Sequence, residues 1–121
     1  MEPRIYRVIH HITTHLDRET PLEELAQSVN LSASRLRHLF KAETGLSPSQ
    51  YLKAQRLEKA RLLLENTFLN LKEVMHQSGF ADRSHFMRDF KKAYGVAPLQ
   101  HRKQFLIGQQ KQNAVAKTAT F

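Results

Sequence analysis

Residues 34–50 read SRLRHLFKAETGLSPSQ, and residues 84–100 read SHFMRDFKKAYGVAPLQ. A shift of 50 residues pairs identical residues in the two stretches: Ser34 with Ser84, Phe40 with Phe90, Lys41 with Lys91, Gly45 with Gly95, Pro48 with Pro98 and Gln50 with Gln100. Further upstream the shift is 49, which pairs Leu22 with Leu71 and Glu24 with Glu73 and indicates one extra residue in the second copy, at Gly79. Such a repeat fixes the architecture, because each copy is expected to be one supersecondary unit.

Periodicity and capping signals predict helices joined by short turns from residue 4 to residue 106. Apolar residues recur at spacings of three and four over residues 4–17, and residues 20–23 (TPLE) are typical of a capping box that begins a helix ending near Ser28. The other helices are expected over residues 32–44, 47–66, 70–78, 82–93 and 98–106. Ser32, Asn70 and Asp82 are expected to cap them, and Gly45 is expected to stop one. No segment shows sustained period-two alternation, so no strand is predicted.

This pattern predicts an all-α fold of two helix-turn-helix subdomains, residues 4–45 and 70–106, joined by a linker helix over residues 47–66. The tail, residues 107–121, lacks periodicity and is expected to be poorly ordered. In a helix-turn-helix the second helix enters the DNA major groove. A linker of roughly 17 residues would be about 26 Å long. With its flanking turns it would hold two reading helices near the roughly 34 Å between successive major-groove faces. One chain would then read a site without two-fold symmetry.

Composition points to a polyanionic partner. The 121 residues include 19 Lys and Arg against 11 Asp and Glu, a formal charge of +8 at pH 7, which favours nucleic acid. No apolar run is longer than three residues, as in Leu62 to Leu64, which is too short for a membrane span, and the N-terminus lacks the apolar region of a signal peptide. Without cysteine the chain has no disulfide framework and no thiolate metal site. These features predict a cytoplasmic protein.

Several motifs resemble those of the AraC/XylS family of bacterial transcription regulators. They are SPSQYL at 47–52, RLEKARLL at 56–63, GF at 79–80, SHF at 84–86, RDFKK at 88–92 and YGVAP at 94–98. The resemblance covers about residues 5–105. It implies a seven-helix DNA-binding domain that binds promoter DNA and mostly activates transcription through contact with RNA polymerase. Many members carry an effector-sensing domain N-terminal to this one. The chain has no room for it, so an effector ligand is expected only if a separate domain exists.

The family pattern and helical periodicity together select candidate DNA-contacting residues. The outward positions of the two second helices are Ser34, Arg37, His38 and Lys41 in the first copy, and Arg83, Ser84, Met87 and Arg88 in the second. Each of the three arginines is expected to bind guanine N7 and O6. The helices opening at Ser47, with Ser49, and at Pro98 are expected to receive phosphates on free backbone N–H groups.

This sequence departs from the family pattern at two of these positions. His38 stands where many relatives have arginine, and it carries full charge only at lower pH. Ala97 stands where a hydroxyl residue commonly caps the last helix, so a phosphate contact there is expected to be weaker or to use the backbone alone.

Other interpretations of these residues stay open at this point. Met87 is as suited to bracing the core edge as to meeting a thymine methyl group, and Arg56 is expected to form an intramolecular ion pair. His11 and His15 have a metal-binding spacing, but no glutamate completes a zinc motif, so no metal site is predicted. No nucleophile elbow, phosphate-binding glycine loop or paired carboxylates are visible, and no enzyme is predicted. The alternative function is a protein-binding or RNA-binding adaptor, and a protein adaptor would present a contiguous apolar patch instead of basic second helices.

Overall fold

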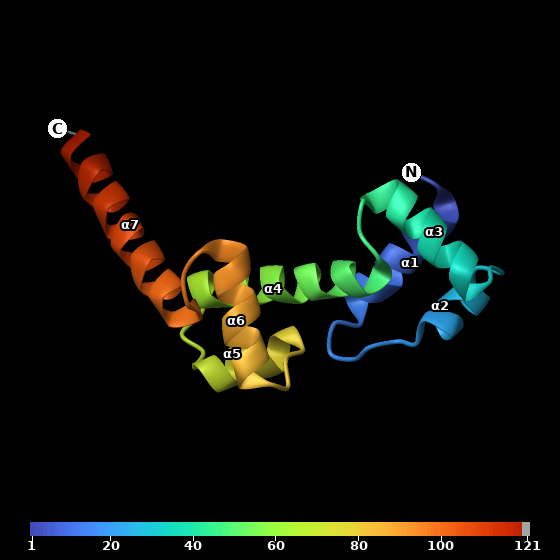
Figure 1. The fold of residues 1–121 in the computed structure, drawn as a ribbon. Helices are drawn as coiled ribbons and strands as arrows, with labels where there is room; N and C mark the ends of the chain where they lie inside the picture. The colour runs from blue at the N-terminus through green and yellow to red at the C-terminus, as the bar shows by residue number, and fades with distance from the viewer. Residues whose placement is uncertain (120–121) are drawn as a thin grey trace. The chain divides into compact units, whose positions relative to one another are not determined.

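A computed structural model of the chain describes the backbone of residues 1–119 and the side chains of residues 1–112. Within that range it contains seven helices and no strand (Figure 1): α1 Pro3–Thr14, α2 Leu22–Ser28, α3 Ala33–Thr44, α4 Pro48–Asn66, α5 Leu71–Ser78, α6 Arg83–Tyr94 and α7 Pro98–Ala119. The predicted all-α fold with two helix-turn-helix motifs and a long connecting helix is confirmed. The chain divides inside α4 into two compact units, unit 1 (Met1–Arg56) and unit 2 (Leu57–Phe121).

Unit 1 packs α1, α2, α3 and the first turns of α4 around one apolar core. The core consists of Ile5, Val8, Ile12, Leu25, Ala26, Val29, Leu36, Phe40 and Leu52. Phe40 has no exposed surface, and the ring of Tyr51 meets it edge-on with centroids 5.4 Å apart. The first turns of α4 therefore belong to the packing of unit 1.

Unit 2 has a separate core built from the last turns of α4 together with α5 and α6. Its buried members are Leu57, Ala60, Leu64, Leu71, Val74, Met75, Phe86 and Phe90. His101 of α7 meets the Phe90 ring at 5.7 Å and 74°, which is the role that Tyr51 has in unit 1. Arg102 Nε donates a hydrogen bond to Leu64 O at 2.9 Å, which fixes the start of α7 on α4.

The turns of the two helix-turn-helix motifs have the same hydrogen bonds. Asn30 and Gly79 both have positive φ, 58° and 90°. Leu31 N–H bonds to Ala26 O at 2.9 Å, and Phe80 N–H bonds to Met75 O at 2.8 Å, as in a Schellman helix end. The shift of 49 residues therefore holds through Phe80. The prediction that Gly79 is the extra residue is wrong, because Gly79 matches Asn30 and the insertion is at position 81.

Four of the predicted N-terminal helix caps are confirmed and one is wrong. Ser32, Ser47, Asn70 and Asp82 accept hydrogen bonds from backbone N–H groups three residues later. Thr20 does not cap α2, which begins after Pro21 without any side-chain cap. The physical reason is competition, because Thr20 Oγ1 lies 2.9 Å from His11 Nε2.

The first and last helices end at positions that differ from the prediction. α1 ends at Thr14 rather than at residue 17. At this end Thr14 Oγ1 donates a hydrogen bond to His10 O at 2.7 Å, and His15 Nδ1 lies 2.9 Å from His11 O. α7 does not stop near residue 106 but runs to Ala119, so residues 107–119 are helical where a poorly ordered tail was expected. Its later residues are rich in Gln, Lys and Ala, which favour helix without needing an apolar stripe. Residues 120 and 121 lie outside the described part. None of the described helices is both long and apolar enough to cross a membrane.

Candidate nucleic-acid interface

The second helix of unit 1, α3, separates a buried face from a charged one. Ser32 Oγ accepts a hydrogen bond from Arg35 N–H at 3.1 Å, and Leu36 and Phe40 are buried. Four predicted contacts occupy the opposite face at helical spacing: Ser34, Arg37, His38 and Lys41. All four are exposed, and with Ala42 they line one shallow depression of the surface. The structure thus brings the predicted contacts of the first copy together on one cationic face.

The start of α4 is closed by a reciprocal cap. Ser47 Oγ accepts from Gln50 N–H at 3.2 Å, and Gln50 Oε1 accepts from Ser47 N–H at 3.0 Å. Pro48 has no N–H, so Ser49 N–H is the amide of the first turn that this cap does not use. Arg37 lines the same cavity as Ser47 and Ser49. The charged face of α3 is therefore continuous with the start of α4.

In unit 2, α6 repeats the division between buried and charged faces. Asp82 Oδ1 accepts a hydrogen bond from His85 N–H at 2.8 Å, and this bond is the main reason that the pKa of the Asp82 carboxyl is lowered. Phe86 and Phe90 are fully buried on the inner face, whereas Arg83 and Ser84 are exposed in the first turn.

Arg88 and Met87 differ in how far they reach solvent. The Arg88 side chain is 67% exposed, and its Nε lies 3.7 Å from Asp89 Oδ1, a loose contact that leaves the guanidinium accessible. Met87 is half-buried and packs against the core of unit 2. Of the second-copy candidates, Arg83, Ser84 and Arg88 are thus freely accessible, and Met87 lies at the boundary between core and surface.

A polar network that the sequence analysis missed fixes α6 and α7 to α4 in unit 2. Arg61 pairs with Glu58 and, through Nη1, with Glu65 Oε2 at 2.7 Å. The Tyr94 hydroxyl donates to Glu58 Oε2 at 3.2 Å, and His101 Nε2 lies 2.7 Å from Glu65 Oε2. Hydrogen bonding from Arg61 lowers the pKa of Glu58, and the two glutamates raise the pKa of Arg61. The i, i+3 and i, i+4 spacings of Glu58, Arg61 and Glu65 were the available sequence signal.

Arg56 and the two spaced histidines all have intramolecular partners. Arg56 Nε donates to Leu16 O at 2.8 Å, so its contact is internal as expected but is made to a carbonyl. His11 and His15 stack with ring centroids 4.3 Å apart, and burial is the main cause of a lowered pKa at His11. In the part of the chain that the structure describes, no three His, Cys, Asp or Glu side chains are grouped to hold a metal ion.

The geometry of two capped, basic second helices agrees with comparisons to known proteins. A family model described as a helix-turn-helix domain matches residues 25–104, which span both second helices and the two helices between them, α4 and α5. The chain belongs to the AraC/XylS family.

Curated AraC/XylS relatives are longer than this chain. The arabinose operon regulatory protein of Escherichia coli (strain K12) is 37% identical over 103 residues, which are 84% of this chain and 35% of that protein. The xylose operon regulatory protein of the same strain is 32% identical over 101 residues, covering 84% of this chain and 26% of that protein. The chain therefore spans about a quarter to a third of the length of these relatives.

Solved structures of AraC/XylS domains share the fold. The C-terminal domain of AraT, a response regulator from Geobacillus stearothermophilus, matches with a TM-score of 0.78 and 34% identity, covering 85% of this chain and 86% of that one. The DNA-binding domain of the global transcriptional factor AdpA, solved in complex with a target DNA, matches with a TM-score of 0.77 and 27% identity, covering 84% of this chain and 91% of that one.

Proposed function

We propose that the chain binds double-stranded promoter DNA sequence-specifically, with α3 and α6 each entering a major-groove segment of one site. The observation that carries this proposal is the repeated division of α3 and α6 into a buried apolar face and an exposed basic face. A helix exposed in this way fits the major groove, which is about 12 Å wide. The DNA-bound AdpA domain supports duplex DNA as the ligand.

In this proposal three arginines read bases and the start of α4 holds the backbone. Arg37, Arg83 and Arg88 each present a guanidinium fork to guanine N7 and O6. Ser49 N–H and the Ser47 hydroxyl meet a phosphate, where the helix dipole favours negative charge. The remaining candidates complete the two surfaces: Ser34, His38 and Lys41 on α3, and Ser84 and Met87 on α6, with Met87 as an apolar edge.

The named relatives are operon regulatory proteins, which supports a role in transcription. We infer that the chain regulates transcription as an activator that contacts RNA polymerase, and that it acts by binding rather than as an enzyme. Its location in this proposal is the bacterial cytoplasm, where promoter DNA is found. Regulation by an effector in the manner of a sugar operon regulator would need a separate domain.

Selection from a pool of random duplexes tests sequence-specific binding. We expect a defined sequence to be enriched, and its affinity to fall with salt at a slope of about −0.9 per phosphate neutralised in a plot of log affinity against log salt. Equal affinity for selected and random duplexes at moderate salt would overturn the proposal. An RNA hairpin that competes as well as the selected duplex would favour the adaptor alternative.

Arginine variants separate base contacts from phosphate contacts. Arg88→Ala is expected to cost about 1–3 kcal/mol at one base-pair position and little at the others, measured by fluorescence anisotropy on single-base variants of the selected site. Lys72→Ala is the matched control, because it removes one exposed positive charge from α5 in the same unit. A uniform loss across all duplexes for Arg88→Ala would assign this residue to a phosphate instead.

A further inference from the structure

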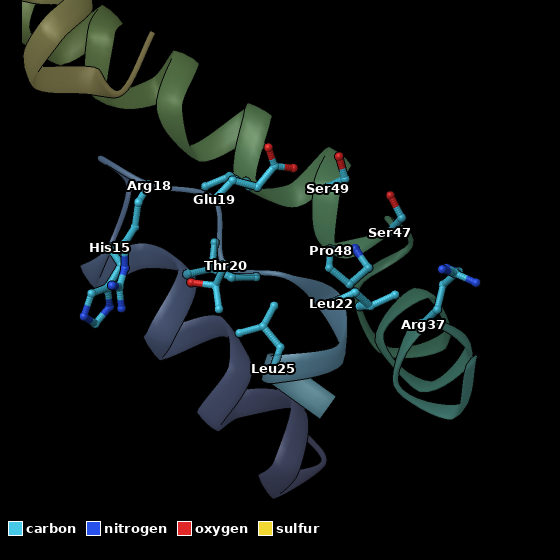
Figure 2. Close-up of a pocket in the computed structure, with 12 residues that line it drawn as sticks. His15, Arg18, Glu19, Thr20, Leu22, Leu25, Arg37, Ser47, Pro48 and Ser49 are labelled. Carbon is cyan, nitrogen blue, oxygen red and sulfur yellow. The ribbon is translucent and has the colours of Figure 1, made fainter. Parts of the chain in front are cut away.

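Unit 1 contains a cavity of about 290 Å³ beside the proposed DNA contacts (Figure 2). It lies between the loop after α1, the start of α2 and the start of α4. Its apolar wall is formed by Ile12, Leu22, Leu25 and Leu52. Figure 2 shows polar side chains at its two ends, with His15 and Arg18 at one end and Arg37 and Ser47 at the other. Glu19 and Thr20 lie between these two ends (Figure 2), so the cavity combines an apolar wall with polar and charged side chains.

Hydrogen bonds hold the loop that forms one wall of this cavity. Arg56 Nε donates to Leu16 O at 2.8 Å at the beginning of the loop. Thr20 Oγ1 lies 2.9 Å from His11 Nε2 at its end. These contacts anchor the loop to α4 and α1 before any ligand binds. A preformed wall reduces the ordering cost of binding.

The lining favours a small ligand that carries a negative charge. Two guanidinium groups, of Arg18 and Arg37, outnumber the one carboxylate of the lining, that of Glu19. Arg37 adjoins the start of α4, whose helix dipole and serine hydroxyls also favour an anion. Alkyl groups gain about 0.8 kcal/mol per buried CH₂ against an apolar wall. The volume is near the lower end of the roughly 300–1,000 Å³ typical of ligand sites, so the ligand is small.

We propose that this cavity binds a small aliphatic carboxylate, with its carboxylate against Arg37 and Ser47 and its alkyl chain along Leu22, Leu25 and Leu52. Ser47 is also a proposed phosphate contact and Arg37 a proposed base contact, so the bound carboxylate takes the place of that phosphate at Ser47 and occupies the guanidinium of Arg37. Ligand and duplex therefore compete for unit 1, and this competition rests on the proposed function. A carboxylate that accumulates would release the regulator from DNA without any separate effector domain.

Titration of the full chain with hexanoate, followed by amide NMR without DNA, tests the site independently of DNA binding. We expect saturable shifts for the backbone amides of residues 15–20, 22, 47 and 49–52. Hexanol carries the same alkyl chain without the charge and is expected to bind at least about tenfold more weakly, which corresponds to about 1.4 kcal/mol. Inorganic phosphate, the charge without the chain, is expected not to saturate over the same range. Shifts that do not saturate with hexanoate, or equal affinity for hexanol, would overturn the proposal.

A cavity-filling variant connects the site to DNA binding. Leu22→Phe enlarges a half-buried side chain of the apolar wall that is not a proposed DNA contact. It is expected to weaken hexanoate binding at least about tenfold and to leave duplex affinity unchanged. Leu63→Phe, which enlarges a half-buried leucine of unit 2, is the matched control and is expected to change neither affinity.

Competition is then measured at constant ionic strength, with chloride replacing hexanoate in the reference. Saturating hexanoate is expected to weaken duplex binding by the parent chain at least about fivefold and to have no effect on Leu22→Phe. Full duplex affinity of the parent in saturating hexanoate would refute the proposal, as would unchanged hexanoate affinity in Leu22→Phe. If the chain binds hexanoate with the affinities expected above but binds no selected duplex, the proposed function is refuted and the carboxylate site is still supported.

Discussion

Replacement of Phe90 by alanine is the most direct test of how unit 2 supports α6. Phe90 is fully buried, and its ring centroid lies 5.8 Å from Phe86, 4.7 Å from Tyr94 and 5.7 Å from His101. Truncating a buried phenylalanine costs about 3–5 kcal/mol, because the cavity left behind collapses only in part. We therefore expect unit 2 to lose about 4 kcal/mol of its free energy of unfolding.

Native-state hydrogen exchange measured by NMR is the assay, because it reports local unfolding free energies residue by residue. Amides of α6 in Phe90→Ala are expected to exchange about a thousandfold faster, since each 1.4 kcal/mol is about a factor of ten. Amides of α1 to α3 are expected to keep their protection, because unit 1 has its own core. Phe40→Ala is expected to reverse the pattern.

Phe68→Ala is the matched control for this test. The Phe68 side chain is 95% exposed, so its removal is expected to change stability by less than about 0.5 kcal/mol. Parent-like protection of α6 in Phe90→Ala would refute the core assignment. Equal loss of protection in both units would refute the conclusion that their cores are separate.

Three further predictions concern His11, Gly95 and Gly108. The folded-state pKa of His11 is lowered, mainly by burial, so the unfolded chain binds more protons than the folded chain, and stability is lost as the pH falls below the ordinary value of 6.5. The melting temperature is therefore expected to depend less steeply on pH for His11→Gln than for the parent. His76→Gln, which replaces an exposed histidine, is the control and is expected to behave like the parent. Gly95 has a φ of +86° with no atom within 4 Å of an added Cβ, so Gly95→Ala is expected to cost about 1–2 kcal/mol from backbone strain alone in urea unfolding. Gly108→Ala, within α7, is expected to raise helix content measured by circular dichroism instead.

Local signals predicted much of the fold because they act over a few residues. Gly45 and Gly95 end helices in the left-handed conformation, which carries no Cβ penalty in glycine. Asn70 caps α5 as predicted, and with Glu73 it forms a capping box from groups only three residues apart. Thr20 carries the same kind of signal, but its hydroxyl meets a histidine nine residues away. A tertiary partner of this kind cannot be read from capping rules.

The candidate site shows the same difference between local and tertiary information. Helical periodicity suffices to place Arg37 and Arg88 outside, since Leu36 and Phe86 must face the core. The cavity of unit 1 depends on where the loop after α1 lies, and no spacing in the sequence gives that position. The half-buried placement of Met87 likewise depends on packing, and the sequence left it open between core edge and DNA.

Comparison of equivalent positions in the two units shows why the cavity depends on particular residues rather than on the fold. The shift of 50 residues pairs Leu52 with Arg102 and Arg37 with Met87. In unit 1 the leucine is the buried partner and the arginine is exposed, so an apolar wall and an outward cation border the cavity. In unit 2 the long Arg102 side chain bonds inward to Leu64 O, and Met87 packs against the core. The two units thus place cation and apolar side chain in opposite positions, which makes unit 1 the half of the chain suited to the proposed binding of a small anion.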